Sequence, residues 1–166
     1  MSILKKTLIA SAALALPFSV MANSKLEKMM GDPKQWVQQS GDYAGHRYSE
    51  LDQINKSNVG SLKVAWTFST GVLRGHEGGP LVVGDVMYVH TAIPNIVYAL
   101  DLNDNQKIIW KYNPVKGGKY PGGETMDRVI SVMCCDNVNR GVNYHPNGTI
   151  VLHAADTSVI ALDAKT

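Results

Sequence analysis

The feature that most constrains the fold is a repeated tripeptide, Ala-Leu-Asp, which ends an apolar run at 99–101 and again at 161–163. The two copies lie 62 residues apart, and short β-rich runs joined by tight turns precede each of them. Four short strands per repeat of this length are typical of a propeller blade. A β-sandwich also has short strands at regular intervals, but the repeated tripeptide followed by a polar turn favours the propeller.

The turns and apolar runs place the strands of both repeats. We expect strands at 81–83, 86–90, 96–101 and 107–112 in the first repeat, and at 141–144, 149–153 and 158–163 in the second. Gly84-Asp85 predicts a hairpin turn, and Asn147-Gly148 suits a tight primed turn. Alternating apolar and polar residues predict one further half-buried strand at 62–68.

Outside the repeats the signals are weaker. Residues 23–41 predict one short helix and residues 42–60 an extended surface segment. Residues 116–130 are rich in glycine and contain little apolar material, so they predict a loop longer than a routine connection. Loops of this length are often functional.

The first residues have the three parts of a secretory signal. Lys5 and Lys6 precede an apolar run at 7–18, and small residues at 19–22 give a cleavage site after Ala22. The alternative, a retained membrane anchor, is disfavoured because the run is short for a bilayer. We therefore expect a signal peptide at 1–22, a periplasmic product and no membrane span after cleavage.

Charge and histidine spacing exclude several classes of function. The net charge of +2 falls to zero when Lys5 and Lys6 leave with the signal peptide, so nothing indicates a nucleic-acid or anionic-membrane partner. The histidines show no metal-ligand spacing, and we expect ordinary strand-end and loop roles for all of them: His46, His76, His90, His145 and His153.

Cys134 and Cys135 are adjacent, and they are the only cysteines of the chain. In an oxidising compartment they can bond to each other, bond to outside partners, or simply be two small buried residues. A bridge between neighbours would close a small, strained ring that removes little unfolded-state entropy. Its value would then be local, as a rigid and polarizable plate suited to lying against a flat π-system.

Three segments together resemble the pyrroloquinoline-quinone (PQQ) alcohol dehydrogenases. They are Gly75-His76-Glu77-Gly78-Gly79-Pro80, the run Cys134-Cys135-Asp136-Asn137-Val138-Asn139-Arg140-Gly141, and the Ala-Leu-Asp-Ala-Lys-Thr end. The closest likeness is to the large subunit of methanol dehydrogenases. The resemblance implies an all-β fold, the first two or so blades of an eight-bladed β-propeller after a short N-terminal helical segment. We thus expect the signal peptide at 1–22, the helix and extended segment at 23–60, and a partial propeller, cut off in mid-blade, at 61–166.

The same resemblance implies four cofactor-binding residues. Cys134 and Cys135 would form a disulfide that covers one face of the quinone. Arg140 would pair with a PQQ carboxylate, because a planar guanidinium can donate two hydrogen bonds to it. Glu77 would hydrogen-bond the cofactor or pair with Arg140. Each has an ordinary alternative, since Arg140 could be a surface ion-pair partner and Glu77 a turn carboxylate.

The activity implied is oxidation of a small primary alcohol by hydride transfer to PQQ, with a calcium or lanthanide ion polarising the quinone. Electrons would pass to a periplasmic cytochrome c, and a small subunit or a homodimer could assemble. We find no candidate for the catalytic carboxylate and no metal ligands, so we expect both beyond Thr166 and expect the chain alone to be inactive. The stretch at 116–126 looks longer than in the family, which leaves the subfamily open.

Two other functions remain open at this stage. A non-catalytic periplasmic propeller could serve as an assembly scaffold, although a scaffold has no reason to keep a cysteine pair beside an arginine. A secreted dithiol redox protein is disfavoured because the usual motif has two residues between its cysteines.

Overall fold

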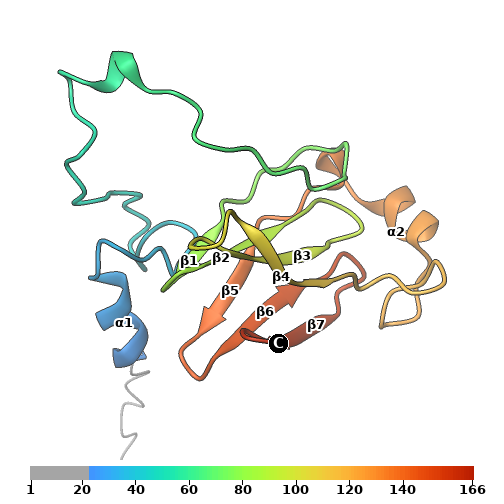
Figure 1. Cartoon of the computed structure of the whole chain (residues 1–166). Coiled ribbons are helices and arrows are strands. Elements are labelled where there is room, and N and C mark those ends of the chain that lie inside the picture. The colour runs from blue at the N-terminus through green and yellow to red at the C-terminus, as the bar shows by residue number, and fades with distance from the viewer. Residues whose placement is uncertain (1–22) are drawn as a thin grey trace, which may run out of the picture.

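Two antiparallel sheets dominate the computed structural model, which describes residues 23–166 (Figure 1). The signal peptide predicted at 1–22 lies outside the described residues. The first sheet has the order β1 (Leu81–Val83), β2 (Val86–His90), β3 (Val97–Asp101) and β4 (Lys107–Tyr112). The second has the order β5 (Val142–His145), β6 (Thr149–His153) and β7 (Val159–Asp163). Each sheet is a simple up-and-down meander, as in a propeller blade.

The helices are short and lie outside the sheets. Helix α1 (Ser24–Met30) is capped by Asn23, whose Oδ1 accepts a hydrogen bond from the backbone N–H of Leu26 at 3.2 Å. This is the helical segment predicted near the N-terminus. Helix α2 (Met126–Val132) and the single 3₁₀ turns η1 (Val59–Ser61) and η2 (Cys135–Asn137) complete the set. Within residues 23–166, no helix is both long and apolar enough to cross a bilayer.

The main core lies between the two sheets. The first sheet contributes Leu81, Tyr88, Val97 and Ala99, and the second contributes Val142, Ile150 and Leu152, all buried. Full burial of one aliphatic side chain contributes about 1.5–3 kcal/mol. Each sheet therefore has an apolar face, and these two faces pack against each other.

The repeated tripeptide has a structural role in this packing. The carboxylate of Asp163 accepts hydrogen bonds from the backbone N–H groups of Lys165 and Thr166 at 2.7 and 3.2 Å. These bonds close the turn after β7. That turn presents the carbonyl oxygen of Ala164 to the first sheet. Tyr88 Oη and Trp110 Nε1 both donate to this oxygen, at 2.9 and 3.2 Å. The polar turn of one repeat is thus tied to the aromatic residues of the preceding one.

The strand predicted at 62–68 is wrong. Residues 62–68 form no regular secondary structure, and Val64 is 80% exposed. Residues 45–65 belong to a long excursion away from the sheets (Figure 1), so this alternating run has no partner strand among the described residues. Only its end packs. The ring of Phe68 lies edge-on against Tyr98, with centroids 5.1 Å apart, on the outer face of β3.

Two connections also differ from the sequence prediction. The turn at 146–148 is a three-residue connection in which only Gly148 has positive φ, at 91°, and not a two-residue primed turn. Pro146 explains the difference, because its ring restricts φ to about −65° and suits a type I turn. The loop predicted at 116–130 contains the first turn of α2, which packs Val129 against Tyr120.

Candidate cofactor site

The sheets bring together two segments that are far apart in sequence. The glycine-rich segment at 75–79 leads into β1, and the segment at 134–141 leads into β5. At their meeting point Arg140 Nε lies 3.0 Å from Glu77 Oε2. The two side chains are 79% and 48% exposed. The sequence predicted this pairing as one of two roles for Glu77, and the structure places the two residues in direct contact.

Glycines allow the two backbones to approach this closely. A Cβ atom on Gly78 would overlap the His90 ring and lie 2.8 Å from the carbonyl carbon of Arg140. A Cβ atom on Gly141 would overlap the side-chain amide of Gln39. Gly141 also has φ of 141°, a value that other residues rarely adopt. Gly78 is therefore required by space, and Gly141 by conformation.

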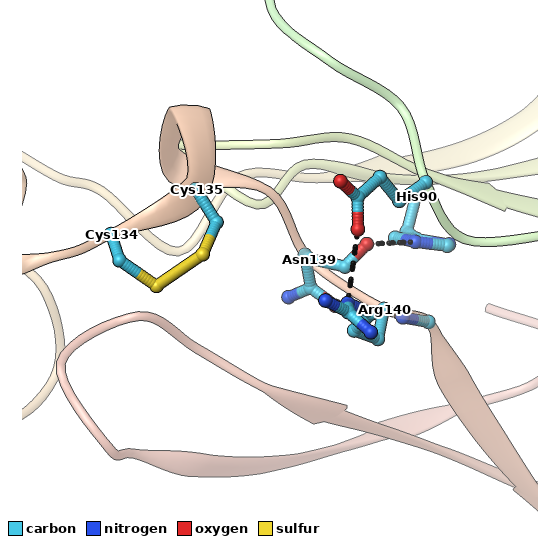
Figure 2. A network of polar contacts seen from close by, with 7 residues as sticks. His90, Cys134, Cys135, Asn139 and Arg140 are labelled. Carbon is cyan, nitrogen blue, oxygen red and sulfur yellow. Dashed lines mark hydrogen bonds and ion pairs between the residues drawn. A yellow bond between two sulfur atoms is a disulfide. The ribbon is translucent and has the colours of Figure 1, made fainter.

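Asn139, which directly precedes Arg140, holds this segment in place. Its Nδ2 donates to the carbonyl of His153 at 2.9 Å, and its Oδ1 accepts the N–H of Gly141 at 2.9 Å. Its own carbonyl accepts a hydrogen bond from His90 Nε2 at 3.0 Å (Figure 2). The backbone around Arg140 is thus fixed to β2 and to the end of β6, while the guanidinium group projects into solvent.

A disulfide joins Cys134 and Cys135, as the resemblance implied (Figure 2). Both cysteines are exposed, so the interpretation of two small buried residues is wrong. The pair follows α2, whose N-terminus is capped by the Thr125 hydroxyl. Beyond it, the carbonyl of Asn137 accepts the N–H of Ile93 at 3.1 Å. The disulfide is therefore presented on a short segment that is fastened at both ends.

His90 is the one site histidine that the structure buries, at 4% exposure. Burial lowers its pKa below the usual 6.5, nearby His76 lowers it further, and the hydrogen bond to Asn139 opposes both effects. The ring is therefore neutral at pH 7, and Nε2 must carry the proton because a carbonyl oxygen can only accept. Nδ1 is buried and has no hydrogen-bond partner among the described residues.

A pocket of about 440 Å³ opens beside Arg140. Its lining includes Asn95, which is 1% exposed. Asn95 Oδ1 accepts the N–H of Ala155 at 2.9 Å, whereas its Nδ2 is buried with no hydrogen-bond partner in the described part of the chain. The exposed guanidinium of Arg140 suits a ligand that carries carboxylate oxygens. The residues present therefore fit a flat, acidic quinone, with the disulfide available as an apolar surface.

The resemblance also implied a metal ion. Residues 23–166, apart from the side chain of Asp136, contain no group of three or more His, Cys, Asp or Glu side chains that could hold an ion. The sequence analysis placed the metal ligands and the catalytic carboxylate beyond Thr166, and that remains a prediction.

The sequence analysis missed two contributors to the site. His90 was assigned an ordinary strand-end role, although it lies two residues after Tyr88 and therefore on the same inward face of β2. That spacing could have indicated its burial. Asn95 gave no usable signal, because its position depends on the loop between β2 and β3.

Comparison with known proteins identifies the class. The model of the PQQ-type glucose/ethanol/alcohol dehydrogenase β-propeller domain matches residues 36–166, so the chain belongs to this family and forms part of a β-propeller. It is 56% identical over 158 residues to a lanthanide-dependent methanol dehydrogenase of Methylorubrum extorquens. That match covers 95% of this chain and 25% of the relative.

Two further relatives agree with this assignment. Subunit 1 of the methanol dehydrogenase [cytochrome c] of Paracoccus denitrificans is 45% identical over 150 residues, covering 87% of this chain and 22% of that protein. The solved structure of a europium-containing methanol dehydrogenase superposes with a TM-score of 0.78 at 52% identity, over 87% of this chain and 23% of that one. The chain thus spans about a quarter of the length of these relatives. The predicted family and the predicted β-propeller are confirmed, whereas the number of blades remains a prediction.

Proposed function

We propose that this chain supplies the quinone-contacting segment of a PQQ-dependent dehydrogenase that oxidises methanol or a similar small primary alcohol. The observation that carries the proposal is the exposed Cys134–Cys135 disulfide on the same segment as Arg140, which pairs with Glu77. The polarizable disulfide suits contact with the ring of a flat acid, and the planar guanidinium of Arg140 suits the carboxylates of the same acid.

Each residue has a separate task in this proposal. Arg140 binds a carboxylate through the guanidinium N–H groups that Glu77 leaves free, and Glu77 fixes the orientation of the guanidinium. The disulfide covers one face of the ring and excludes water from it. When bound, the quinone supplies the hydride acceptor, while the protein contributes position and charge.

The remaining parts of the reaction are proposed from the relatives. Proteins whose names specify a lanthanide are 56% and 51% identical to this chain, and one at 45% is named for cytochrome c. We therefore propose a lanthanide in preference to calcium, a cytochrome c as electron acceptor, and a small subunit or a second copy as a possible assembly partner. The metal ligands and the catalytic base would come from outside residues 23–166.

Export is part of the proposal. A signal peptide at 1–22 would deliver the product to the periplasm, with a helix and extended segment at 23–60 and propeller structure at 61–166. Sequencing the N-terminus of the periplasmic product should give Asn23 first. An intact Met1 in the membrane fraction would contradict export with cleavage.

The test of the quinone site is the Cys134→Ala/Cys135→Ala double variant in the complete protein that carries this chain. Titration of quinone into the apo-protein, followed by absorbance, should show affinity reduced about tenfold or more. The thermal midpoint of the apo-protein should change little, because a ring between neighbours constrains almost none of the unfolded chain. Unchanged quinone affinity in the variant would contradict the role of the disulfide. If the wild-type protein binds no quinone, the scaffold function is favoured instead.

A further inference from the structure

His90 lies where the two segments of the cofactor site meet. It is the last residue of β2, and its side chain points to the same face of the sheet as buried Tyr88. Figure 2 shows its ring directed at the backbone of Asn139, beside Arg140. Among the described residues, it is the only buried histidine.

The first contact of His90 is to the Arg140 segment. Nε2 donates to the carbonyl oxygen of Asn139 at 3.0 Å, one peptide unit before Arg140. A hydrogen bond from a buried donor is directional and costly to leave unmade. It therefore fixes the peptide from which the Arg140 side chain departs.

The second contact is to the Glu77 segment. Gly78 lies so close to the imidazole that a Cβ atom there would overlap both Cε1 and Nε2. On its other side the same atom would lie 2.8 Å from the carbonyl carbon of Arg140. The backbone next to Glu77 is therefore confined between the ring of His90 and the main chain of Arg140.

The Glu77–Arg140 pair cannot hold this geometry by itself. Its members are 48% and 79% exposed, and exposed ion pairs contribute about 0–1 kcal/mol. Two long side chains in water meet only in some of their rotamers, and how many of these bring them together depends on how their backbones are placed. The backbones of Glu77 and Arg140 must therefore be held by the buried groups behind them.

We propose that His90 is the positioning residue that holds the backbones of Glu77 and Arg140 in register and so preorganises the pair to receive the quinone. This inference rests on the proposed function, because it assigns a cause to the geometry of the same site. His90 touches no cofactor in this proposal and acts only through the two residues that do.

A comparison of three variants in the complete protein tests the proposal. His90→Leu fills part of the space without a donor, and His90→Gln keeps an N–H donor at similar reach. Tyr88→Phe is the matched control on the same strand and face, since the bond that it loses goes to Ala164 and not to residues 139–140. The readouts are the dissociation constant of quinone for the apo-protein and the thermal midpoint of that apo-protein.

We expect His90→Leu to weaken quinone binding about tenfold, and His90→Gln to remain within about threefold of wild type. Tyr88→Phe should lower the thermal midpoint and leave quinone affinity unchanged. A merely structural role for His90 predicts the opposite, namely a lower midpoint with normal affinity in His90→Leu. That result, or equal damage in His90→Leu and His90→Gln, overturns the proposal.

Gly78→Ala provides a second test that keeps His90 in place. The added methyl group must displace the ring or the Arg140 backbone, so quinone affinity should fall about tenfold or more. Gly60→Ala is the matched control, because a Cβ atom at this glycine meets no neighbour within 4 Å and its φ is not positive. Normal affinity in a folded Gly78→Ala protein overturns the proposal. Wild-type protein that binds no quinone overturns the proposed function itself, which separates the two failures.

Discussion

The sheet core and the cofactor site of this chain are built on opposite principles. In the core, residues such as Leu81 and Leu152 are fully buried and packed between two hydrogen-bonded meanders. In the site, Arg140 and both cysteines are exposed, and their segments are held through the main chain by a few polar contacts. The difference teaches that the side chains that stabilise the sheets and those of the candidate cofactor site are largely separate sets.

The largest expected effect tests the core. Leu152→Ala should lower the free energy of unfolding by about 2–5 kcal/mol, since Leu152 is 0% exposed and its removal leaves a cavity. Urea denaturation of the complete protein measures the change. Leu73→Ala is the matched control, because Leu73 is 99% exposed and should cost less than about 0.5 kcal/mol. Equal losses in the two variants would mean that the sheet interface does not determine stability.

The second prediction tests the site. Arg140→Gln should reduce quinone affinity about 10- to 100-fold, because a charge-assisted pair of hydrogen bonds is lost. The free energy of unfolding should stay within about 1 kcal/mol, because the Arg140 side chain is 79% exposed. Titration of the apo-protein with quinone and urea denaturation measure the two quantities.

Arg128→Gln is the control for this prediction. Arg128 Nε lies 2.9 Å from Glu124 Oε2 and the side chain is 71% exposed, so it forms a similar surface pair outside the described site. This variant should bind quinone normally. If both arginine variants bind equally weakly, the effect comes from overall charge and not from the site.

The smallest effect concerns His90, which belongs to both regions. Burial lowers its pKa in the folded protein below the unfolded value of about 6.5. Below pH 6.5 the unfolded state therefore takes up a proton that the folded state does not, so His90 makes stability fall as the pH drops. Above pH 6.5 its contribution is constant. The expected slope is at most about 1.4 kcal/mol per pH unit.

Urea denaturation between pH 5 and 8 measures this slope, with His90→Gln as the reference. The difference in unfolding free energy between wild type and variant should shrink as the pH falls. His76, whose charge also lowers the pKa of His90, is present in both the wild type and the variant. A difference that is constant with pH would show that folding does not shift the pKa of His90.

Local pattern predicted the strands well. The runs at 86–90, 107–112 and 149–153 match β2, β4 and β6 residue for residue, because each lies between strong turn signals. The run at 62–68 alternates apolar and polar residues but finds no partner strand within residues 23–166. Alternation describes a surface that could pair, whereas pairing itself depends on distant residues.

Helix α2 was missed for a related reason. Seven residues are too few for a helix that is stable by itself in water. Its stability depends on burying Val129 against Tyr120 in the preceding stretch and against Ile93 in the loop between β2 and β3. The glycine-rich stretch before it therefore gave the stronger local signal, and that signal predicted only a loop.

The sequence by itself determined the class of protein, since the turn-bounded strands, the repeated Ala-Leu-Asp and the cysteine-to-glycine run at 134–141 are all local patterns. Only the tertiary structure decided that Glu77 meets Arg140 and that His90 lies behind both. The physical reason is that short-range preferences fix φ, ψ and strand faces one segment at a time. Contacts between residues some 60 positions apart exist only after the two sheets have packed.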